Sequence, residues 1–496
     1  MSTTIAPSED LADKPGSQTN CSDIAFLEEK KDASELTIPS SSVWSDMLRS
    51  AEIWGQFTRL KKLDLNSIGV TSLPPALEAL APSLEILFLS ENNFEVIPPV
   101  IGKLHRLRML SFRGNRLTEL SSTNLPSSSL IWLILTNNEI SKISENVSAL
   151  KHVRKLMLSH NKITSIPKEM AECKDLELIR LANNDINVPL PKEFLTLPKL
   201  AWISLAGNPI AHCPQMKEKE ILKSSVSFDE SAILGRGASG TVYLGKYKEK
   251  NVAVKIFKHQ STGISCSDGN PEDEAAINAL VDHPLAVSAH GVFLSDEEGS
   301  RTHEGMIMPL LENAEALGKT PSFSTVTRDA APSESAKDMS REQVLSVVWN
   351  VATTLEHVHS DAKVVNGDVY LHNILQCGEG VAKVSDWGAS FVYDGNSDLA
   401  TIFEAIEVLA FGRLVQDLFD WHLDTAVPDS TEPADFLGRS RGKPMERGPV
   451  YDLMSSILQP HQSKRPSFSD IKARLSSVPM FDSARASVEH LEAEIH

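Results

Sequence analysis

The most regular feature of the chain is a short alternation of leucines with other residues that returns every 23 or 24 positions. Copies of the pattern LxxLxL begin at residues 60, 84, 107, 130, 153, 176 and 200. Such an alternation places its leucines on one face of a short β-strand. Because each unit can bury that face only against its neighbours, the pattern predicts a solenoid of seven stacked repeats with a continuous apolar core.

Asparagine marks the end of the predicted strands. It follows six of the seven copies, and Ile68 takes its place in the first one; the six are Asn92, Asn115, Asn138, Asn161, Asn184 and Asn208. The amide carries donors and an acceptor, so we expect it to satisfy backbone groups where the chain turns inward. This combination is the signature of leucine-rich repeats.

The residues between the leucines are expected to face the concave side of the solenoid. They include Phe88, Met109, Arg113, Trp132, Met157, Arg180 and Trp202. Aromatic side chains dominate the energetics of protein interfaces. We therefore expect a protein partner on this face, with Phe88, Trp132 and Trp202 as candidate anchors. The alternative is that these are isolated exposed hydrophobic residues, which are common on protein surfaces.

The pattern changes on both sides of the repeats. Residues 1–42 are polar and predicted to be a disordered tail, and helical spacing of apolar residues from 43 onward predicts a cap for a repeat domain that extends to 226. Short β-branched alternations followed by helical segments then predict a second, α+β domain over 227–476. Residues 477–496 are predicted to form a C-terminal helical tail.

A glycine-rich segment opens the second domain. It has the form G-x-G-x-x-G-x-V, with Gly235, Gly237, Gly240 and Val242, and "VAVK" follows with Ala253 and Lys255. Because it lies between two β-like runs, it does not fit a dinucleotide-binding fold, in which a helix follows directly. Glycines let the backbone approach phosphates closely. Lys255 is expected to bind the phosphates and to be held by a carboxylate, for which Glu274 is the candidate.

Further on, hard oxygen ligands appear in a suggestive order. "VVNGDVYLHNIL" contains Asp368 and Asn373, and "KVSDWGAS" contains Asp386. Carboxylate and carboxamide oxygens suit Mg²⁺, so Asn373 and Asp386 are predicted metal ligands.

Residues 228–475 resemble a eukaryotic-type protein kinase domain. With the repeats, the chain resembles soluble leucine-rich-repeat protein kinases of bacterial and protist type, and we expect no similarity to membrane-spanning plant receptor kinases. The resemblance implies a bilobal domain that uses ATP and Mg²⁺ to phosphorylate protein hydroxyls, on Ser or Thr in preference to Tyr. It assigns two catalytic residues, Asp368 as the catalytic base and Lys255 as the cation that binds the phosphates. It assigns the adenine pocket to Val242, Ala253, Met308, Leu310 and Leu375.

The departures from that family concern the catalytic loop and the segment after it. Asn366 and Gly367 stand where kinases carry His and Arg, and Tyr370 stands where serine/threonine kinases carry Lys. Only 21 positions separate Asp386 from Glu407, so the platform that docks protein substrates is expected to be largely missing. Without it, Arg465 is expected to pair with Glu404 or to cap its own helix.

Charge and cysteine content limit the possible partners and the cellular compartment of the protein. The formal net charge of −18 makes nucleic acid an unlikely partner. Five dispersed cysteines without a CxxC pair fit a reducing compartment, and no apolar run approaches the length of about 18 residues that spans a bilayer. We expect a cytoplasmic or nuclear protein.

Two alternative functions stay open at this level. The exchanged catalytic loop and the short following segment also fit a pseudokinase scaffold that acts through repeat-mediated protein binding. The Gly-Asp catalytic loop with Asn five residues later also resembles small-molecule kinases of the aminoglycoside and choline kinase type.

Overall fold

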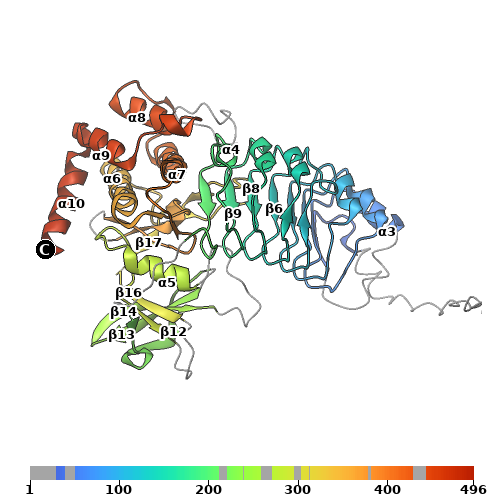
Figure 1. Cartoon of the computed structure of the whole chain (residues 1–496), viewed down its shortest axis with the longest axis horizontal. Coiled ribbons are helices and arrows are strands. Elements are labelled where there is room, and N and C mark those ends of the chain that lie inside the picture. Colours follow the sequence, from blue (N-terminus) through green and yellow to red (C-terminus); the bar gives the residue numbers. More distant parts are fainter. Residues whose placement is uncertain are drawn as a thin grey trace, which may run out of the picture.

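The chain folds into an elongated repeat array that abuts a bilobal domain (Figure 1). The computed structural model describes residues 29–38, 51–211, 220–237, 240–258, 271–294, 303–311, 313–377, 381–427 and 443–495. The predicted tail at residues 1–28 and the beginning of the predicted cap helix lie outside these residues. No helix within the described ranges is long and apolar enough to cross a membrane.

One parallel sheet runs along the concave side of the repeat array. Its strands, in spatial order, are β1 (Glu35–Thr37), β2 (Lys62–Asp64), β3 (Ile86–Phe88), β4 (Met109–Ser111), β6 (Trp132–Ile134), β8 (Lys155–Met157), β9 (Leu178–Arg180) and β10 (Trp202–Ser204). The polar composition of residues 1–42 predicts a disordered tail that includes residues 35–37. That prediction is wrong for them, because β1 pairs with β2 and buries Leu36 against the first repeat.

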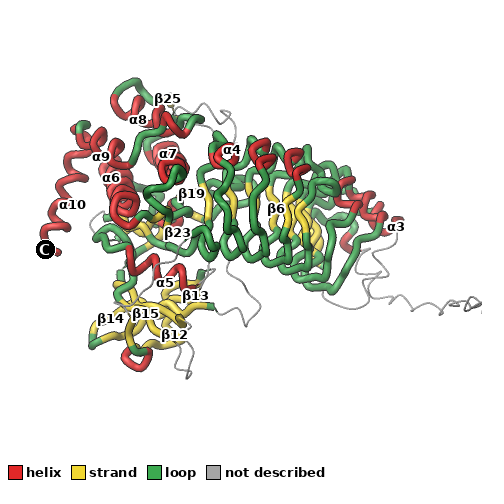
Figure 2. Tube along the Cα trace, viewed as in Figure 1, coloured by secondary structure: helices red, strands yellow, loops and turns green. Residues whose placement is uncertain are grey.

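Short helical turns and two minor strands cover the opposite side of the array (Figure 2). They are η1 (Pro75–Leu80), η2 (Pro99–Lys103), β5 (Glu119–Leu120), β7 (Lys142–Ile143), η3 (Glu145–Ala149), η4 (Lys168–Glu172) and α4 (Lys192–Leu195). At the N-terminal end, α3 (Ala51–Gly55) buries Trp54 against the first coils. This helix covers the end of the core, as the apolar spacing predicted.

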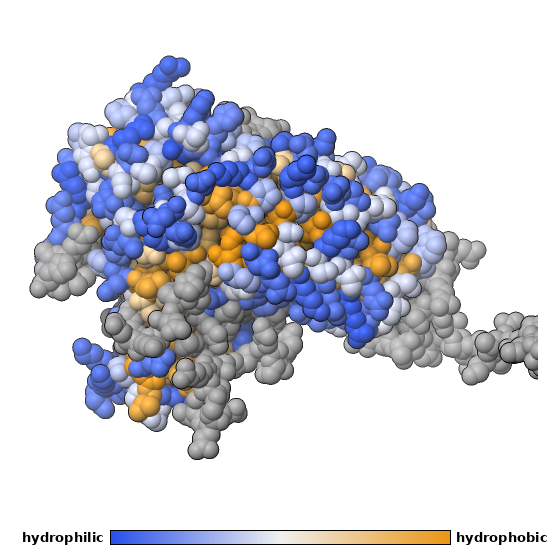
Figure 3. All heavy atoms as spheres, viewed as in Figure 1, coloured by the Kyte–Doolittle hydropathy of each residue, from blue (hydrophilic) through white to orange (hydrophobic). Residues whose placement is uncertain are grey.

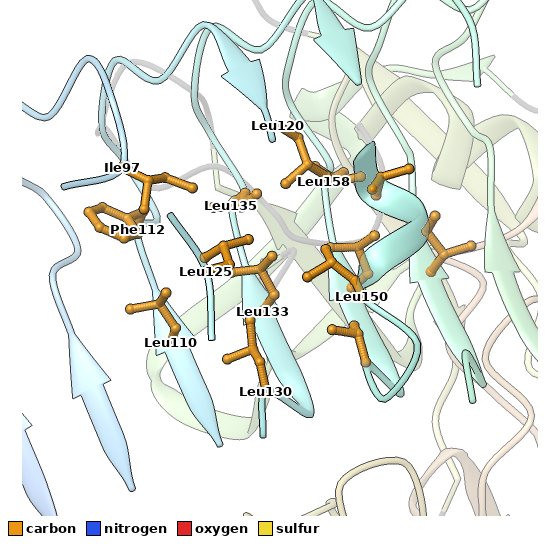
Figure 4. Packing of buried hydrophobic residues seen from close by; sticks show 14 of the residues in the cluster. Ile97, Leu110, Phe112, Leu120, Leu125, Leu130, Leu133, Leu135, Leu150 and Leu158 are labelled. Carbon is orange, nitrogen blue, oxygen red and sulfur yellow. The ribbon is translucent and has the colours of Figure 1, made fainter. Parts of the chain in front are cut away.

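The leucines of successive repeats stack as the period predicts. Leu87, Leu110 and Leu133 occupy equivalent register positions on adjacent strands, and each is fully buried. Figure 4 shows Leu110 and Leu133 of this column, with Leu125 and Leu150 from the turns packed beside them. Each repeat therefore buries its apolar face only against the next repeat, which requires the array to be continuous.

The asparagines form a ladder of side-chain to backbone hydrogen bonds, as predicted. The Asn115 amide nitrogen donates to the carbonyl oxygens of Leu89 (2.9 Å) and Phe112 (3.0 Å), and its oxygen accepts from the Phe94 amide at 3.0 Å. The pattern recurs at Asn138. Since backbone groups buried without a partner are costly, this ladder explains why the turn tolerates burial.

The first lobe of the second domain is a twisted sheet with one helix. Its strands, in spatial order, are β11 (Glu220–Ile221), β15 (Gly291–Leu294), β16 (His303–Pro309), β14 (Lys250–Phe257), β13 (Gly240–Tyr247) and β12 (Val226–Arg236); α5 (Pro271–Leu280) is the helix, and η5 (Lys223–Ser225) precedes β12. Antiparallel pairing of β12, β13 and β14 brings the glycine-rich segment beside the lysine of β14.

The second lobe is mainly helical. Its helices are α6 (Arg341–His357), α7 (Ala400–His422), α8 (Pro449–Ile457), α9 (Phe468–Ser476) and α10 (Asp482–Ile495), with the turns η7 (Val358–Ala362), η8 (Leu371–Asn373), η10 (Gln462–Lys464) and η11 (Pro479–Phe481). The predicted C-terminal helix is α10, which packs on α6 and buries Ala484 and Val488.

Short strand pairs frame the catalytic loop of this lobe. They are β17 (Glu315–Ala316), β18 (Gly318–Lys319), β19 (Ala331–Pro332), β20 (Val364–Val365), β21 (Ile374–Gln376), β22 (Ala382–Val384), β23 (Phe391–Val392), β24 (Thr425–Ala426) and β25 (Lys443–Pro444). The pairs β21–β22 and β20–β23 hold the two ends of the loop.

Two hydrophobic clusters cross the junction between the array and the second lobe. In one, Phe391, Phe403 and Ile406 are buried together with the repeat leucines. In the other, Leu178 and Trp202 of the last repeats are buried with the core of the second lobe. The array and this lobe are thus fused by shared core rather than joined only by a linker.

Candidate active site

A cavity of about 600 Å³ lies between the two lobes of the second domain. Twelve of the thirteen residues predicted for nucleotide, metal and catalysis line it: Gly235, Gly237, Gly240, Val242, Ala253, Lys255, Glu274, Met308, Leu310, Leu375, Asn373 and Asp386. The exception among the predicted site residues is Asp368, which lies just beyond the cavity and is joined to it through Asn373.

Glycine is required where β13 begins. A Cβ added to Gly240 would lie 2.4 Å from the carbonyl oxygen of Ile256 on the neighbouring strand. That distance leaves no room for any other side chain, so the hairpin can lie flat over Lys255 only with glycine there. The register pairs Gly235 with Val242 and Val242 with Lys255, which aligns the glycine-rich segment with the lysine across three strands.

The lysine is held by the predicted carboxylate. Lys255 on β14 forms an ion pair with Glu274 on α5, and the exposed fractions of the two residues are 8% and 2%. A buried charge is costly unless it is paired. The pair therefore fixes the ammonium group at the wall of the cavity, where it can face an anionic ligand.

Apolar side chains form the other walls. Ala253 and Met308 are buried in one small cluster, against which Val242 and Leu375 pack from the two lobes. Met308 pairs with Ala253 across β16 and β14. This apolar slot, which Pro309, Leu310 and Leu311 also line, suits an aromatic ring such as adenine.

Asp386 meets the requirements of a metal ligand. It has a left-handed backbone (φ 58°), unusual for a residue other than glycine, and its carboxylate accepts from the Gly388 amide at 3.1 Å. Strained residues of this kind cluster at functional sites. Together with the Asn373 carboxamide it offers hard oxygen donors in the wall of the same cavity as Lys255, which fits Mg²⁺.

The atypical residues of the catalytic loop are structurally specified. Asn366 is fully buried; its oxygen accepts from the Asp368 amide at 3.0 Å, and its nitrogen donates to the Asp386 carbonyl oxygen at 3.3 Å. Asn366 thus connects the loop to the segment that carries Asp386.

Glu407 is a site residue that the sequence analysis did not assign. From α7, one of its carboxylate oxygens accepts from the Gly367 amide at 2.8 Å and the other contacts His359 Nε2 at 2.7 Å. With an exposed fraction of 1%, it anchors the backbone of the catalytic loop from behind. An acidic residue within the apolar run from Ala405 to Phe411 was the one signal that could have pointed to it.

Asp329 fixes the other end of the loop. Its carboxylate accepts from the Leu371 amide at 2.7 Å and contacts His372 Nδ1 at 2.5 Å. Burial lowers the pKa of His372, but hydrogen bonding and the charge of Asp329 outweigh burial and raise that pKa above its ordinary value. His372 therefore lines the cavity with a side chain whose protonated, positively charged form is favoured.

Asp368 is held by two donors from different domains. Its Oδ2 accepts from the Asn373 amide nitrogen at 2.9 Å. Its Oδ1 is paired with the guanidinium of Arg180 on β9 of the repeat array, and a second nitrogen of Arg180 donates to the Gly367 carbonyl oxygen at 2.7 Å. The repeats therefore reach the proposed catalytic base directly.

Trp202 is not available to an external partner, which corrects the prediction for this residue. Its ring stacks on Tyr370 of the catalytic loop with centroids 4.7 Å apart and an interplanar angle of 4°. Its Nε1 donates to the Val369 carbonyl oxygen at 3.2 Å, and the residue is 2% exposed. The second domain covers the C-terminal part of the concave face, which no spacing within the repeats could indicate.

The segment after Asp386 is short, as counted from the sequence, and the array covers it. Phe391 pairs in a strand with Val365, and both are buried in the cluster formed with the repeats. Arg465 does not pair with Glu404, which accepts from the Tyr393 hydroxyl at 2.6 Å. The Arg465 guanidinium instead donates to the carbonyl oxygens of Ala405 (2.8 Å) and Pro198 (3.1 Å), the latter in the last repeat.

The N-terminal part of the concave face keeps a recess of about 360 Å³. It is lined by Phe88 and Trp132 among others, and Lys155 lies over the Trp132 ring at 4.2 Å. On the face drawn in Figure 3, apolar atoms gather over the array and are bordered by polar residues. Of the three predicted anchors, Phe88 and Trp132 therefore face an open surface.

Comparison with known families accounts for both parts of the chain. Residues 228–410 match the protein kinase domain, and residues 58–117 and 151–210 match the leucine rich repeat. The predicted fusion of repeats with a kinase domain is confirmed.

Individual relatives are similar to this chain at low identity. Wall-associated receptor kinase-like 21 of Arabidopsis thaliana is 27% identical over 237 residues, which is 47% of this chain and 34% of the relative. A tyrosine-protein kinase of Caenorhabditis elegans is 25% identical over 280 residues, 51% of this chain and 48% of the relative. A probable LRR receptor-like serine/threonine-protein kinase of Arabidopsis thaliana is 22% identical over 301 residues, 56% and 32% of the two chains.

In each of these pairs the alignment covers less than half of the relative's own length. The plant relatives include proteins named as receptor kinases, so the expectation that the chain has no similarity to that group is wrong.

Proposed function

Because the chain joins leucine-rich repeats to a protein kinase domain, we propose that it transfers the γ-phosphoryl group of ATP to hydroxyl groups of proteins, on Ser or Thr in preference to Tyr. The observation that carries the proposal is the cavity between the lobes. It brings the Lys255–Glu274 ion pair together with Asn373 and Asp386, while Asp368 lies next to Asn373.

In the proposed reaction, the substrate hydroxyl oxygen bonds to the γ-phosphorus, and the bond from that phosphorus to the oxygen retained by ADP breaks. Asp368 accepts the hydroxyl proton. Lys255 binds the phosphates from the first lobe, and the backbone of the glycine-rich hairpin covers them. The apolar slot of Ala253, Met308 and Leu375 holds the adenine ring of ATP. This binding fixes the position of the γ-phosphoryl group relative to the substrate hydroxyl.

Asn373 and Asp386 would hold a Mg²⁺ ion, whose charge would neutralise the phosphate oxygens during transfer. Positioning of these two residues depends on the loop itself. The Asn373 amide nitrogen donates to both the backbone carbonyl oxygen and the carboxylate of Asp368, at 3.0 and 2.9 Å. This arrangement orients the proton acceptor relative to the proposed metal site.

We assign recruitment of a protein partner to the N-terminal half of the repeat array. Phe88 and Trp132 line the recess there, and the apolar Met109 and Met157 lie beside them. Flexible methionines next to rigid aromatic rings suit an apolar segment of a partner protein. The C-terminal half contributes to the kinase domain instead.

The proposal is tested with the full-length chain, γ-labelled ATP, Mg²⁺ and dephosphorylated casein. Asp386→Asn is nearly isosteric and removes the carboxylate charge, so we expect transfer to fall by about a hundredfold or more. The matched control Asp338→Asn changes an exposed residue of the same lobe and should transfer phosphate like the wild type. Equal transfer by Asp386→Asn and wild type would refute the assignment of this site.

The second candidate is a scaffold that binds nucleotide without transferring phosphate. The ion pair between Arg180 and the proposed base favours it, because this pair occupies one carboxylate oxygen of Asp368. Calorimetry distinguishes the two: uptake of MgATP without transfer to any protein, or to the chain itself, would identify the scaffold.

A further inference from the structure

Arg180 supplies a cation to the part of the catalytic loop around Asp368, which has none of its own. Residues 366–370 of this loop are Asn, Gly, Asp, Val and Tyr. Within the described part of the chain, Arg180 is the cationic side chain that forms an ion pair with Asp368. It comes from the repeat array, 188 positions earlier in the sequence.

The guanidinium is fixed at two points. One nitrogen donates to the Gly367 carbonyl oxygen and another to Asp368 Oδ1, while the side chain itself is 4% exposed. The planar fork of arginine makes such a two-point contact with little loss of freedom on binding. Arg180 therefore constrains both the backbone before Asp368 and the direction of its carboxylate.

This contact leaves the carboxylate able to react. An ionised carboxylate has about four acceptor sites, and in this structure Asp368 uses its side chain to accept from Arg180 and Asn373. The side chain of Asp368 is 15% exposed, whereas that of Arg180 is 4% exposed. A substrate hydroxyl can approach the aspartate without displacing the arginine.

The contacts around Arg180 are close and buried, as expected for an interface that stays closed. Gly367 has a positive φ of 71°, and a Cβ at this position would lie 2.6 Å from the carbonyl oxygen of Ile203 in the last strand of the array. Beside it, Trp202 stacks on Tyr370. An inhibitory contact that is released on activation would have to expose these buried groups to water, which is unfavourable for apolar side chains.

We propose that Arg180 is a positioning residue for phosphoryl transfer, supplied by the repeat array to complete the catalytic loop of the kinase domain. The inference rests on the proposed function. It assigns the repeats two separate tasks: the N-terminal half binds partners, and the C-terminal half is a structural part of the active site.

The test compares Arg180→Ala and Arg180→Gln with wild type in the full-length chain. Gln keeps most of the length and a hydrogen-bond donor but removes the charge. We expect kcat to fall by about a hundredfold, with the KM for ATP unchanged within about twofold, because the nucleotide cavity is untouched. Guanidinium at millimolar concentration should restore part of the activity to Arg180→Ala. Arg116→Ala, an exposed arginine of the same array, is the matched control and should match wild type with or without guanidinium.

Three results would overturn the inference. An increase in kcat for either variant would identify Arg180 as an inhibitory contact. An unchanged kcat for Arg180→Gln would show that its charge has no role, even if Arg180→Ala failed to fold. A parallel loss of MgATP binding would make the residue structural. Failure of the proposed function is separate, because it would appear as absence of transfer by wild type and Arg116→Ala alike.

Discussion

Replacement of Trp202 by alanine probes whether the repeats and the kinase domain unfold as one unit. The indole is 2% exposed, stacks on Tyr370 and donates a hydrogen bond to the Val369 carbonyl oxygen. It belongs to a hydrophobic cluster that contains the core of the second lobe. Trp202→Ala would therefore create a cavity at the junction itself and leave a buried acceptor with one partner fewer.

The magnitude follows from burial. Truncating a fully buried tryptophan costs about 3–5 kcal/mol, and losing the partner of a buried carbonyl group adds about 1 kcal/mol. We expect a total of about 5 kcal/mol, which is a large part of the stability of a typical domain. Trp132→Ala is the matched control. Trp132 is only partly buried, with Lys155 lying over its ring at 4.2 Å, and its loss should cost about 1 kcal/mol or less.

The assay is urea unfolding of the full-length chain, followed by circular dichroism and by binding of a fluorescent ATP analogue. For wild type and Trp132→Ala we expect the two signals to change together, because two hydrophobic clusters cross the junction. For Trp202→Ala we expect loss of nucleotide binding at a lower urea concentration than loss of the repeat signal. Coincident transitions with a midpoint equal to that of wild type would refute the idea of a shared core.

Two further predictions concern the recess and the acid side of the stability curve. Trp132→Ala should leave phosphorylation of casein unchanged but reduce recovery of a specific partner in co-purification at least about tenfold, as expected for a hot spot of about 1.4 kcal/mol or more; equal recovery would exclude this surface as the docking site. Burial, with the nearby charges of His357, Lys472 and Lys383, lowers the pKa of His283 to about 4, and its Nδ1 accepts from the Leu285 amide at 3.2 Å, which requires the neutral ring. Between pH 6.5 and about 4 the unfolded chain binds a proton at His283 that the folded chain does not bind. As the pH falls through this range, the free energy of unfolding of wild type should therefore decrease by about 3 kcal/mol more than that of His283→Gln. Urea midpoints that shift equally in the two proteins between pH 7 and pH 4.5 would contradict the assignment.

The sequence was informative where function depends on local spacing. Repeat period, strand alternation and the asparagine after each strand are encoded within about 24 residues, and the ladder at Asn115 and Asn138 follows from them. The cavity residues were predicted in the same way, because each motif places a few residues on one hairpin or loop. The pairing of Lys255 with Glu274 required only one helix between strands of the same sheet.

The sequence was less informative about the partners of the catalytic loop. Glu407 and Asp329 hold its backbone from segments that carry no motif, and their roles depend on the packing of α7 and of the loop after the hinge. Trp202 is a second case, in which the sequence identified the residue but not the group that it contacts. An aromatic residue on a concave face has the same local pattern whether it binds a partner or is buried by a neighbouring domain.

What the sequence alone determined, then, was a stack of repeats followed by a nucleotide cavity, since both arise from contacts between residues that are close in the chain or in one motif set. Tertiary structure alone decided that the last repeats cover the short segment after Asp386 and bring Arg180 to Asp368, 188 positions away. The physical reason is that docking of two domains depends on complementary surfaces and buried area, which no periodicity within either domain records.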